Sequence, residues 1–373
     1  MKCKRIAIVI LLSLMLVLSG CSNSKQIHQR LIIQGIAIDK VMDEYNVTVQ
    51  IFDTKGESND GGDSNTMSIM ESRGRSVADA FEEISKQSGR KPLYSQNLMI
   101  VVGEDTAKDG IENVLNFFVR YYESRPSVNL FISKGQASDI LTYEKDGEIV
   151  PAKDISMLAK NGKVSAASFN STLLDFATAF EGGIKDAGAC LLTKDDQNIK
   201  TSGTAVFEKD KLSGFLNERE TKGSLLLNKE IKNLEETVAI EGIGKVSYDI
   251  ISSKSRAKVK IDDNKPVFDI NICANISILE IAKEPNKELK EKDFDNINNK
   301  IEEQIRSLVS ESINKTVFEY NSDIFNFTKL IKNNQTSYFR TIESNPKETL
   351  KQSSYNVNVK SKIKKIGQES DLV

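Results

Sequence analysis

The residue whose surroundings predict a specific covalent chemistry is Cys21. It follows Leu18-Ser19-Gly20, and these four residues match the lipobox of bacterial lipoprotein signal peptides. Small residues before the cysteine let the chain lie extended in a signal peptidase. We therefore expect cleavage between Gly20 and Cys21 and transfer of a diacylglycerol to the Cys21 thiol. Two acyl chains, such as palmitate, hold a protein stably on a bilayer, whereas one chain is marginal.

Residues 1–20 have the pattern of the export signal that such a modification requires. Lys2, Lys4 and Arg5 form a positively charged start, and Ile6–Leu18 is an uncharged apolar run that is short for a membrane span. The alternative is an ordinary secretory signal that happens to precede a cysteine. The apolar length, the small residues and the position of the cysteine together favour the lipoprotein signal.

No other residues form a catalytic, metal-binding or cofactor-binding pattern. His28, in a short tether expected at 21–28, is the single histidine, which excludes Ser-His-Asp, Cys-His and zinc-type arrangements. Glycine motifs that bind phosphates or dinucleotides are absent. Cys190 and Cys273 are expected to be strand residues and not a disulfide. The sequence thus predicts no catalytic, metal or cofactor residues, and no enzyme.

Acidic clusters do not change this expectation. The segment 55–65 contains Asp60, Asp63 and Asn65, but it lacks the final bidentate glutamate of an EF-hand loop, which favours a solvated loop over a calcium site. Neighbouring glutamates occur at 82–83, 235–236 and 302–303. We expect these pairs on solvated faces of helices or turns, where they do no paired-carboxylate chemistry.

The charge balance excludes a general affinity for nucleic acid. The chain has 51 Lys and Arg against 53 Asp and Glu, and removal of Lys2, Lys4 and Arg5 with the signal leaves 48 against 53, a net charge of about −5. Removing 20 of the 373 residues leaves 353, enough for about two or three domains. Past Cys21 no apolar run approaches a membrane span, so we expect a soluble body held to the membrane by its lipid.

Hydrophobic periodicity predicts an α+β fold of three α/β-type domains, at 29–140, 141–201 and 202–373. The first should contain a strand hairpin (31–38 and 45–51), a helix from Ser76 to Gly89, and a βαβ unit (98–102, 107–122 and 128–132). The second is expected to be a small linking domain with weaker helices at 155–160 and 172–181.

The third expected domain, 202–373, is mainly an antiparallel sheet covered by a long helix. Strand 267–281 alternates apolar and polar residues, which is typical of a sheet with one buried face. Isoleucine, leucine and valine recur at three- and four-residue steps over 297–317, which predicts the covering helix. A helix that binds a partner protein is the alternative. Shorter strands are expected at 204–207, 212–216, 246–250, 257–261 and near 355–366.

Three blocks of sequence, in order, resemble the Ger(x)C (GerAC-like) family of spore germination lipoproteins. The blocks lie at 74–111, 203–223 and 323–327, and they begin with Gly74-Arg75-Ser76-Val77-Ala78, Gly203-Thr204-Ala205-Val206-Phe207 and Asp323-Ile324-Phe325. Two departures are the lack of tryptophan and Gln96-Asn97 in place of a common Ser/Thr-His pair.

The resemblance implies the C subunit of a nutrient germinant receptor, lipid-anchored to the outer face of the spore inner membrane. Its expected partners are the membrane itself and two integral-membrane subunits, A and B. It brings no catalytic residues, and it leaves open whether this subunit binds the nutrient. The alternatives are an extracytoplasmic solute-binding lipoprotein, which should have two similar βα lobes, and an envelope enzyme, which needs titratable groups that this sequence lacks.

Overall fold

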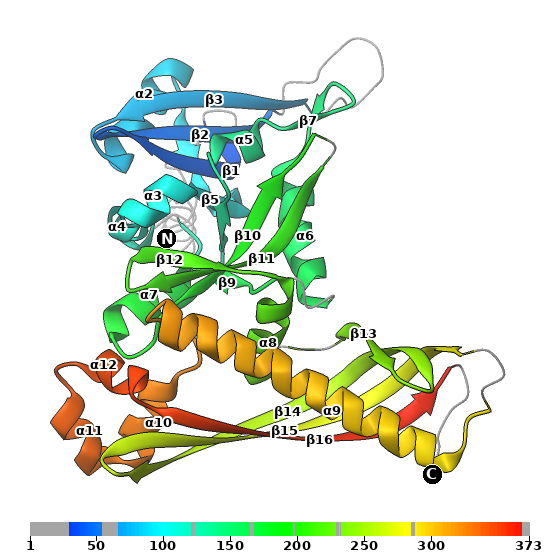
Figure 1. Ribbon diagram of the computed structural model, residues 1–373. Helices are drawn as coiled ribbons and strands as arrows, with labels where there is room; N and C mark the ends of the chain where they lie inside the picture. The colour runs from blue at the N-terminus through cyan, green and yellow to red at the C-terminus, as the bar shows by residue number, and fades with distance from the viewer. Residues whose placement is uncertain are drawn as a thin grey trace, which may run out of the picture.

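Two β-sheets organise the chain in the computed structural model, a large mixed sheet and a second sheet of four strands (Figure 1). The structure describes residues 30–53, 66–120, 124–164, 168–196, 198–228, 231, 233–284 and 288–367. Among these residues no helix is both long and apolar enough to cross a membrane. The mixed α+β architecture agrees with the fold class expected from the sequence.

The large sheet begins with the predicted hairpin. Strand β1 (Arg30–Val41) pairs antiparallel with β2 (Glu44–Asp53), and β2 pairs with β3 (Thr66–Gly74). Helix α2 (Val77–Ser88) then starts where predicted, because the Ser76 side chain accepts a hydrogen bond from the Asp79 N–H at 3.1 Å. Gly89 ends this helix with a φ of 64°, a left-handed conformation that costs glycine little.

The predicted βαβ unit is present, but its helix is divided. Strand β5 (Met99–Gly103) runs parallel to β6 (Asn129–Ser133), and the connection contains α3 (Glu104–Asp109) and α4 (Glu112–Arg120). The single helix expected at 107–122 is therefore wrong. Gly110 has a φ of 129°, which ends α3, and the Ile111 N–H bonds to the carbonyl of Asp210 instead of continuing the helix.

The large sheet continues through the segment between 141 and 216. Helices α6 (Ala152–Val164) and α7 (Leu173–Gly182) are followed by β10 (Gly188–Lys194), β11 (Ile199–Glu208) and β12 (Lys211–Leu216). Because β10 pairs parallel with β6 and antiparallel with β11, the sheet has the order β12-β11-β10-β6-β5-β1-β2-β3. Of the boundaries expected at 140 and 201, the second lies within β11, and the first lies in a short helix (Ser138–Leu141) between the paired strands β6 and β10.

The second sheet has two very long strands. It has the order β13 (Glu235–Ile240), β14 (Gly244–Asp262), β15 (Lys265–Lys283) and β16 (Ser354–Ile366), with β15 and β16 parallel. The strands expected at 246–250 and 257–261 are parts of β14, which carries two register shifts and does not break. Asp263 and Asn264 make the turn to β15 with φ of 45° and 58°.

Helix α9 (Glu291–Ile313) covers one face of the second sheet, as predicted. Its apolar stripe is fully buried or nearly so: Ile297, Ile301, Ile305, Leu308, Val309 and Ile313. Helix α8 (Glu218–Asn228) packs beside α9, and Figure 1 shows both helices between the two sheets.

The other short elements are β4 (Lys91–Leu93), η2 (Tyr94–Gln96), α5 (Ser138–Leu141), β7 (Glu144–Lys145), β8 (Glu148–Ile149), β9 (Ser171–Thr172), η3 (Asn314–Glu319), α10 (Phe327–Asn334), α11 (Thr336–Ile342) and α12 (Pro346–Lys351).

A buried carboxylate, Asp186, joins the two sheets. Its oxygens accept hydrogen bonds from the backbone N–H of Lys209 at 2.9 Å and of Asp323 at 2.8 Å, and from the Lys347 ammonium at 2.8 Å. The Asp186 N–H in turn donates a hydrogen bond to the Asp323 carbonyl at 3.1 Å. Lys209 lies in the β11–β12 turn of the large sheet, whereas Asp323 and Lys347 belong to the second-sheet region, so this one side chain connects both.

Loss of the Asp186 carboxylate should weaken the connection between the sheets. In Asp186→Ala the buried N–H of Asp323 and the part-buried N–H of Lys209 lose their acceptor, and among the described residues Lys347 keeps an ion pair with Glu208 at 3.6 Å, so we expect the free energy of unfolding to fall by about 2–4 kcal/mol. Scanning calorimetry should show a lower melting temperature or separate transitions. The control Lys200→Ala removes an exposed ion pair with Asp195 and should cost about 0–1 kcal/mol. Equal effects of the two substitutions would contradict the proposed junction.

The two described cysteines should differ in reactivity. Both are free, as expected, with Cys190 buried in β10 and Cys273 exposed on β15. Burial raises the pKa of Cys190 to about 12, so its thiol stays protonated and unreactive near neutral pH. Iodoacetamide at pH 8 should alkylate Cys273 in the native protein and Cys190 only after denaturation, as mass spectrometry of tryptic peptides can show. Native labelling that persists in Cys273→Ser would contradict this.

Candidate functional site: the cavity beside α10

The residues with a predicted covalent role lie outside the described part of the chain. Gly20, Cys21 and His28 precede Arg30, the first residue that the structure describes, and the acidic segment 55–65 falls in the gap after Asp53. The lipidation and cleavage predictions therefore stay predictions. Within the described ranges no group of three or more His, Cys, Asp or Glu residues could hold a metal ion.

The sequence block at 203–223 forms the contact between the large sheet and the second-sheet region. Its first part is β11 and β12, and its last part is α8. A side chain at Gly214 would collide with the Tyr320 ring, and one at Gly223 would collide with the carbonyl of Leu308 on α9. Glycine inside a helix costs about 1 kcal/mol relative to alanine. At position 223 this cost is offset by close packing, because a larger residue there would keep α8 from approaching α9.

The third sequence block, 323–327, shapes the start of α10. The Asp323 carboxylate accepts hydrogen bonds from the N–H groups of Phe327 at 2.9 Å and Thr328 at 2.7 Å. Burial raises the pKa of Asp323, although these backbone bonds act to lower it. Asn326 has a φ of 63°, a left-handed conformation that asparagine tolerates better than most residues. The block therefore fixes where its two phenylalanines point.

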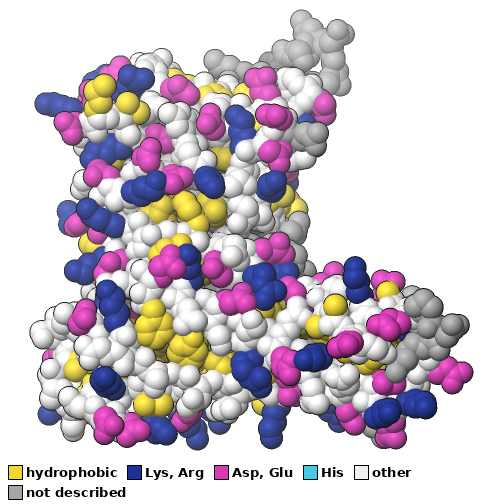
Figure 2. Space-filling view, viewed as in Figure 1, with side chains coloured by type: hydrophobic (Ala, Val, Ile, Leu, Met, Phe, Trp, Pro, Cys, Tyr) yellow, Lys and Arg dark blue, Asp and Glu magenta, His cyan; other side chains and the backbone are white. Residues whose placement is uncertain are grey.

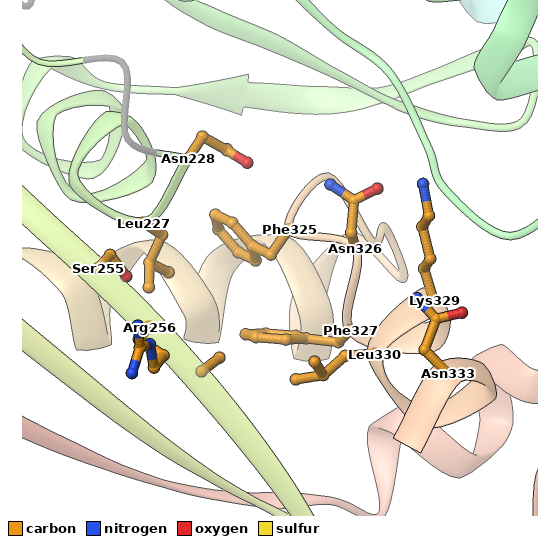
Figure 3. Close-up of a pocket in the computed structure, with 11 residues that line it drawn as sticks. Leu227, Asn228, Ser255, Arg256, Phe325, Asn326, Phe327, Lys329, Leu330 and Asn333 are labelled. Atoms are coloured by element: carbon orange, nitrogen blue, oxygen red, sulfur yellow. The ribbon is translucent and has the colours of Figure 1, made fainter. Parts of the chain in front are cut away.

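Those phenylalanines line a cavity of about 350 Å³ between α8, β14 and α10. Figure 3 shows the Phe325 and Phe327 rings and the Leu227 side chain turned toward the same space. The remaining lining residues are Asn228, Ser255, Arg256, Ala257, Asn326, Lys329, Leu330 and Asn333. Apolar side chains together with a few polar groups are the usual composition of a small-molecule binding pocket, and this lining has five apolar residues beside six polar or charged ones.

The polar groups that line this cavity are suited to binding. Its lining has no carboxylate, no cysteine and no histidine. The amides of Asn228, Asn326 and Asn333 can donate and accept hydrogen bonds, and the ammonium of Lys329 can pair with an anion. Periodicity alone does not reveal this site, because its residues come from three elements that are distant in the sequence.

One acidic pair that was expected on a solvated face has a different role. Glu236 lies on β13 and not on a helix or turn, and its carboxylate binds the Lys222 ammonium at 2.8 Å and the Gln304 amide at 2.7 Å. Burial acts to lower the pKa of Lys222, but the bonds to Glu218 and Glu236 outweigh it and raise that pKa. This cluster ties α8, α9 and β13 together and is structural.

A second hollow, of about 450 Å³, lies between α2 and α4, where the first sequence block begins. Arg75, Ser76, Asn113, Phe117 and Arg120 are among its lining residues. The side chain of Arg75 is 91% exposed, so it is not held in a position that would define a ligand. The cavity beside α10 is therefore the better candidate site.

Comparison with known proteins places the chain in a family. The model described as "Spore germination protein N-terminal domain" matches residues 23–194, and the model "Spore germination B3/ GerAC like, C-terminal" matches residues 202–367. The second match starts at 202, although the large sheet continues to Leu216. The strand hairpin β11–β12 thus opens the C-terminal sequence family while pairing with the N-terminal sheet.

Curated relatives carry matching descriptions. The putative spore germination protein YfkR of Bacillus subtilis (strain 168) is 25% identical over 287 residues, 73% of this chain and 74% of that protein. Spore germination protein B3 of the same organism is 24% identical over 362 residues, 95% of this chain and 96% of that protein. Spore germination protein A3, also of this organism, is 30% identical over 165 residues, 43% of each chain.

The fold also matches a solved structure. The crystal structure of the GerBC protein superposes with a TM-score of 0.57 at 20% identity and covers 88% of this chain and 96% of that chain. Both family models match in order, and together they cover the described residues except those between 195 and 201. The chain belongs to the GerAC-like family of spore germination proteins.

Proposed function

We propose that this protein is the lipid-anchored C subunit of a nutrient germinant receptor, on the outer face of the spore inner membrane. It acts with the integral-membrane A and B subunits to trigger germination. The observation that carries the proposal is the pair of family matches over 23–194 and 202–367, directly after the lipobox that ends at Cys21. We propose no enzymatic step, because the cavity lining lacks catalytic groups.

The proposed mechanism is positional. The lipid on Cys21 keeps the body at the membrane surface, where its faces can contact the partner subunits. The Asp186 junction and the close packing of α8 on α9 join the two sheets. When a partner binds to one sheet and moves it, the other sheet should move with it. Two independent lobes would not move together in this way.

A second candidate function is direct binding of a small solute, and the cavity beside α10 favours it. Its volume of about 350 Å³ and its amide rim suit a small polar organic molecule. Against a solute-binding lipoprotein, the two halves of the chain are unlike each other, one a mixed sheet and the other four strands covered by a helix. Thermal-shift assays with amino acids and sugars separate the two functions, since a ligand stabilises the state that it binds.

Deletion of the gene tests the receptor function. We expect deleted spores to lose germination on at least one nutrient of a panel, measured as the fall in optical density, while germination by a chemical that bypasses the receptors persists. Reintroduction of the wild-type gene should restore the response. Normal germination of deleted spores on every nutrient, in a strain without other receptors of this class, would refute the proposed function.

Substitution of the lipidated cysteine tests the anchor. In Cys21→Ala the thiol that would take the diacylglycerol is absent, so we expect the protein to move from the membrane fraction to the soluble fraction and germination to fall at least tenfold in rate. Cys273→Ala is the matched control, because this exposed cysteine has no predicted lipid. Membrane association and germination that survive Cys21→Ala would contradict a required anchor.

A further inference from the structure

No described helix or strand covers one face of the second sheet. Helix α9 packs on the other face, and along β14 the buried and exposed residues alternate accordingly. The pairing register places Lys254, Cys273 and Lys360 side by side, on adjacent strands of this exposed face. The neighbouring rows of three are Ser252–Asn275–Lys362, Arg256–Asn271–Asn358, Lys258–Asp269–Asn356 and Lys260–Val267–Ser354.

These five rows, which we call the basic face, carry six cations and one acid. The cations are Lys254, Arg256, Lys258, Lys260, Lys360 and Lys362, and all six are exposed. The acid is Asp269, which accepts a hydrogen bond from the Asn356 amide at 2.9 Å. Acidic residues occur beyond the two ends of the face, Asp262 at the β14–β15 turn and Asp249 and Glu235 near β13.

The charge of the basic face opposes that of the whole protein. Six cations against one acid give a local charge of about +5, whereas the chain without residues 1–20 has a net charge of about −5. In the described chain none of the six cations forms an ion pair. Figure 2 shows Lys and Arg side chains along its lower edge, where β14, β15 and β16 lie in Figure 1. Unpaired cations on one surface are available to an external anionic partner.

A shallow hollow lies within the basic face. It has a volume of about 430 Å³, and Lys254, Arg256, Asn271 and Cys273 contribute to its lining. Two cationic side chains and an amide around an open depression can surround a phosphate group, with the guanidinium and the ammonium pairing its oxygens.

The composition of the face favours a lipid surface over a protein partner. Energetically dominant residues of protein interfaces are enriched in tryptophan and tyrosine in desolvated pockets. The five rows contain no aromatic residue, and Val267 is their one aliphatic side chain. Lysines can also protect exposed sheet edges from aggregation, but this role does not require the cations of β14 and β16 to share one face. A flat array of solvated cations is the pattern that attracts anionic headgroups.

We propose that the basic face docks on the anionic phospholipid headgroups of the membrane to which Cys21 is anchored. The inference rests on the proposed membrane location, and it adds an orientation to it. Nine peptide units, at most about 30 Å of chain, separate Cys21 from Arg30. Arg30 begins β1 in the large sheet and not in the sheet that carries the basic face, so the tether holds the protein at the bilayer and the charge of the face sets its orientation.

Vesicle binding by the unlipidated protein tests the basic face. The chain from residue 21, with Cys21→Ala, is sedimented with phosphatidylcholine vesicles that contain none or about one third phosphatidylglycerol. We expect binding to the anionic vesicles only, and weaker binding at high salt. The triple variant Lys254→Gln, Arg256→Gln, Lys258→Gln should bind roughly 100-fold more weakly, about fivefold per basic side chain near an anionic surface. The matched control Lys91→Gln, Lys134→Gln, Lys153→Gln neutralises three exposed lysines of the large-sheet half and should bind normally.

A second readout uses Cys273, which lies inside the basic face. In this chain it is the expected reactive thiol, so its rate of alkylation by a membrane-impermeant maleimide should fall several-fold with anionic vesicles and stay unchanged with neutral ones. Equal binding by the two triple variants, or unchanged Cys273 alkylation, would overturn the proposal, and binding of an acidic protein partner without vesicle binding would replace it. These results do not depend on germination, so they are distinct from failure of the receptor function.

Discussion

The buried carboxylate of Asp186 is the interaction on which the arrangement of the two sheets depends. It is 3% exposed, and it satisfies N–H groups from the β11–β12 turn and from the segment before α10 while it pairs with Lys347. A buried charge is tolerated only when it is paired and hydrogen-bonded. The same segment continues into Asp323, whose carboxylate fixes the start of α10. The junction and the candidate cavity thus share one structural support.

Several residues in the sequence blocks at 203–223 and 323–327 are explained by close packing between the two sheets and not by a catalytic role. Gly214 and Gly223 stand where Tyr320 and α9 approach the backbone, and Asp323 lies at the junction. Such residues hold the two sheets in a fixed relation to each other. Membership in the GerAC-like spore germination family agrees with this function of positioning.

One face of the second sheet is buried and the other is exposed, and the residues on each face explain the difference. One face is apolar and is covered by α9, whose isoleucines are almost completely buried. The other is mostly polar, so it needs no cover to be stable in water, and its cations remain available. With the lipid predicted on Cys21, the proposed docking of this face would add an electrostatic contact with the membrane to the covalent anchor.

Local patterns of the sequence predicted the cap at Ser76 and the apolar stripe of α9, which the structure confirms, because each depends on neighbouring residues only. The same kind of pattern predicts the export signal and the lipidation of Cys21, which stay predictions. Periodicity also predicted the alternation of β15. It could not predict that β10 would pair with β6, that Gly110 would divide a helix, or that Glu236 would bind Lys222. The cavity beside α10 and the basic face were likewise decided by tertiary structure. Both depend on strand register and on which distant segments meet, and these are set by burial and pairing across the whole chain.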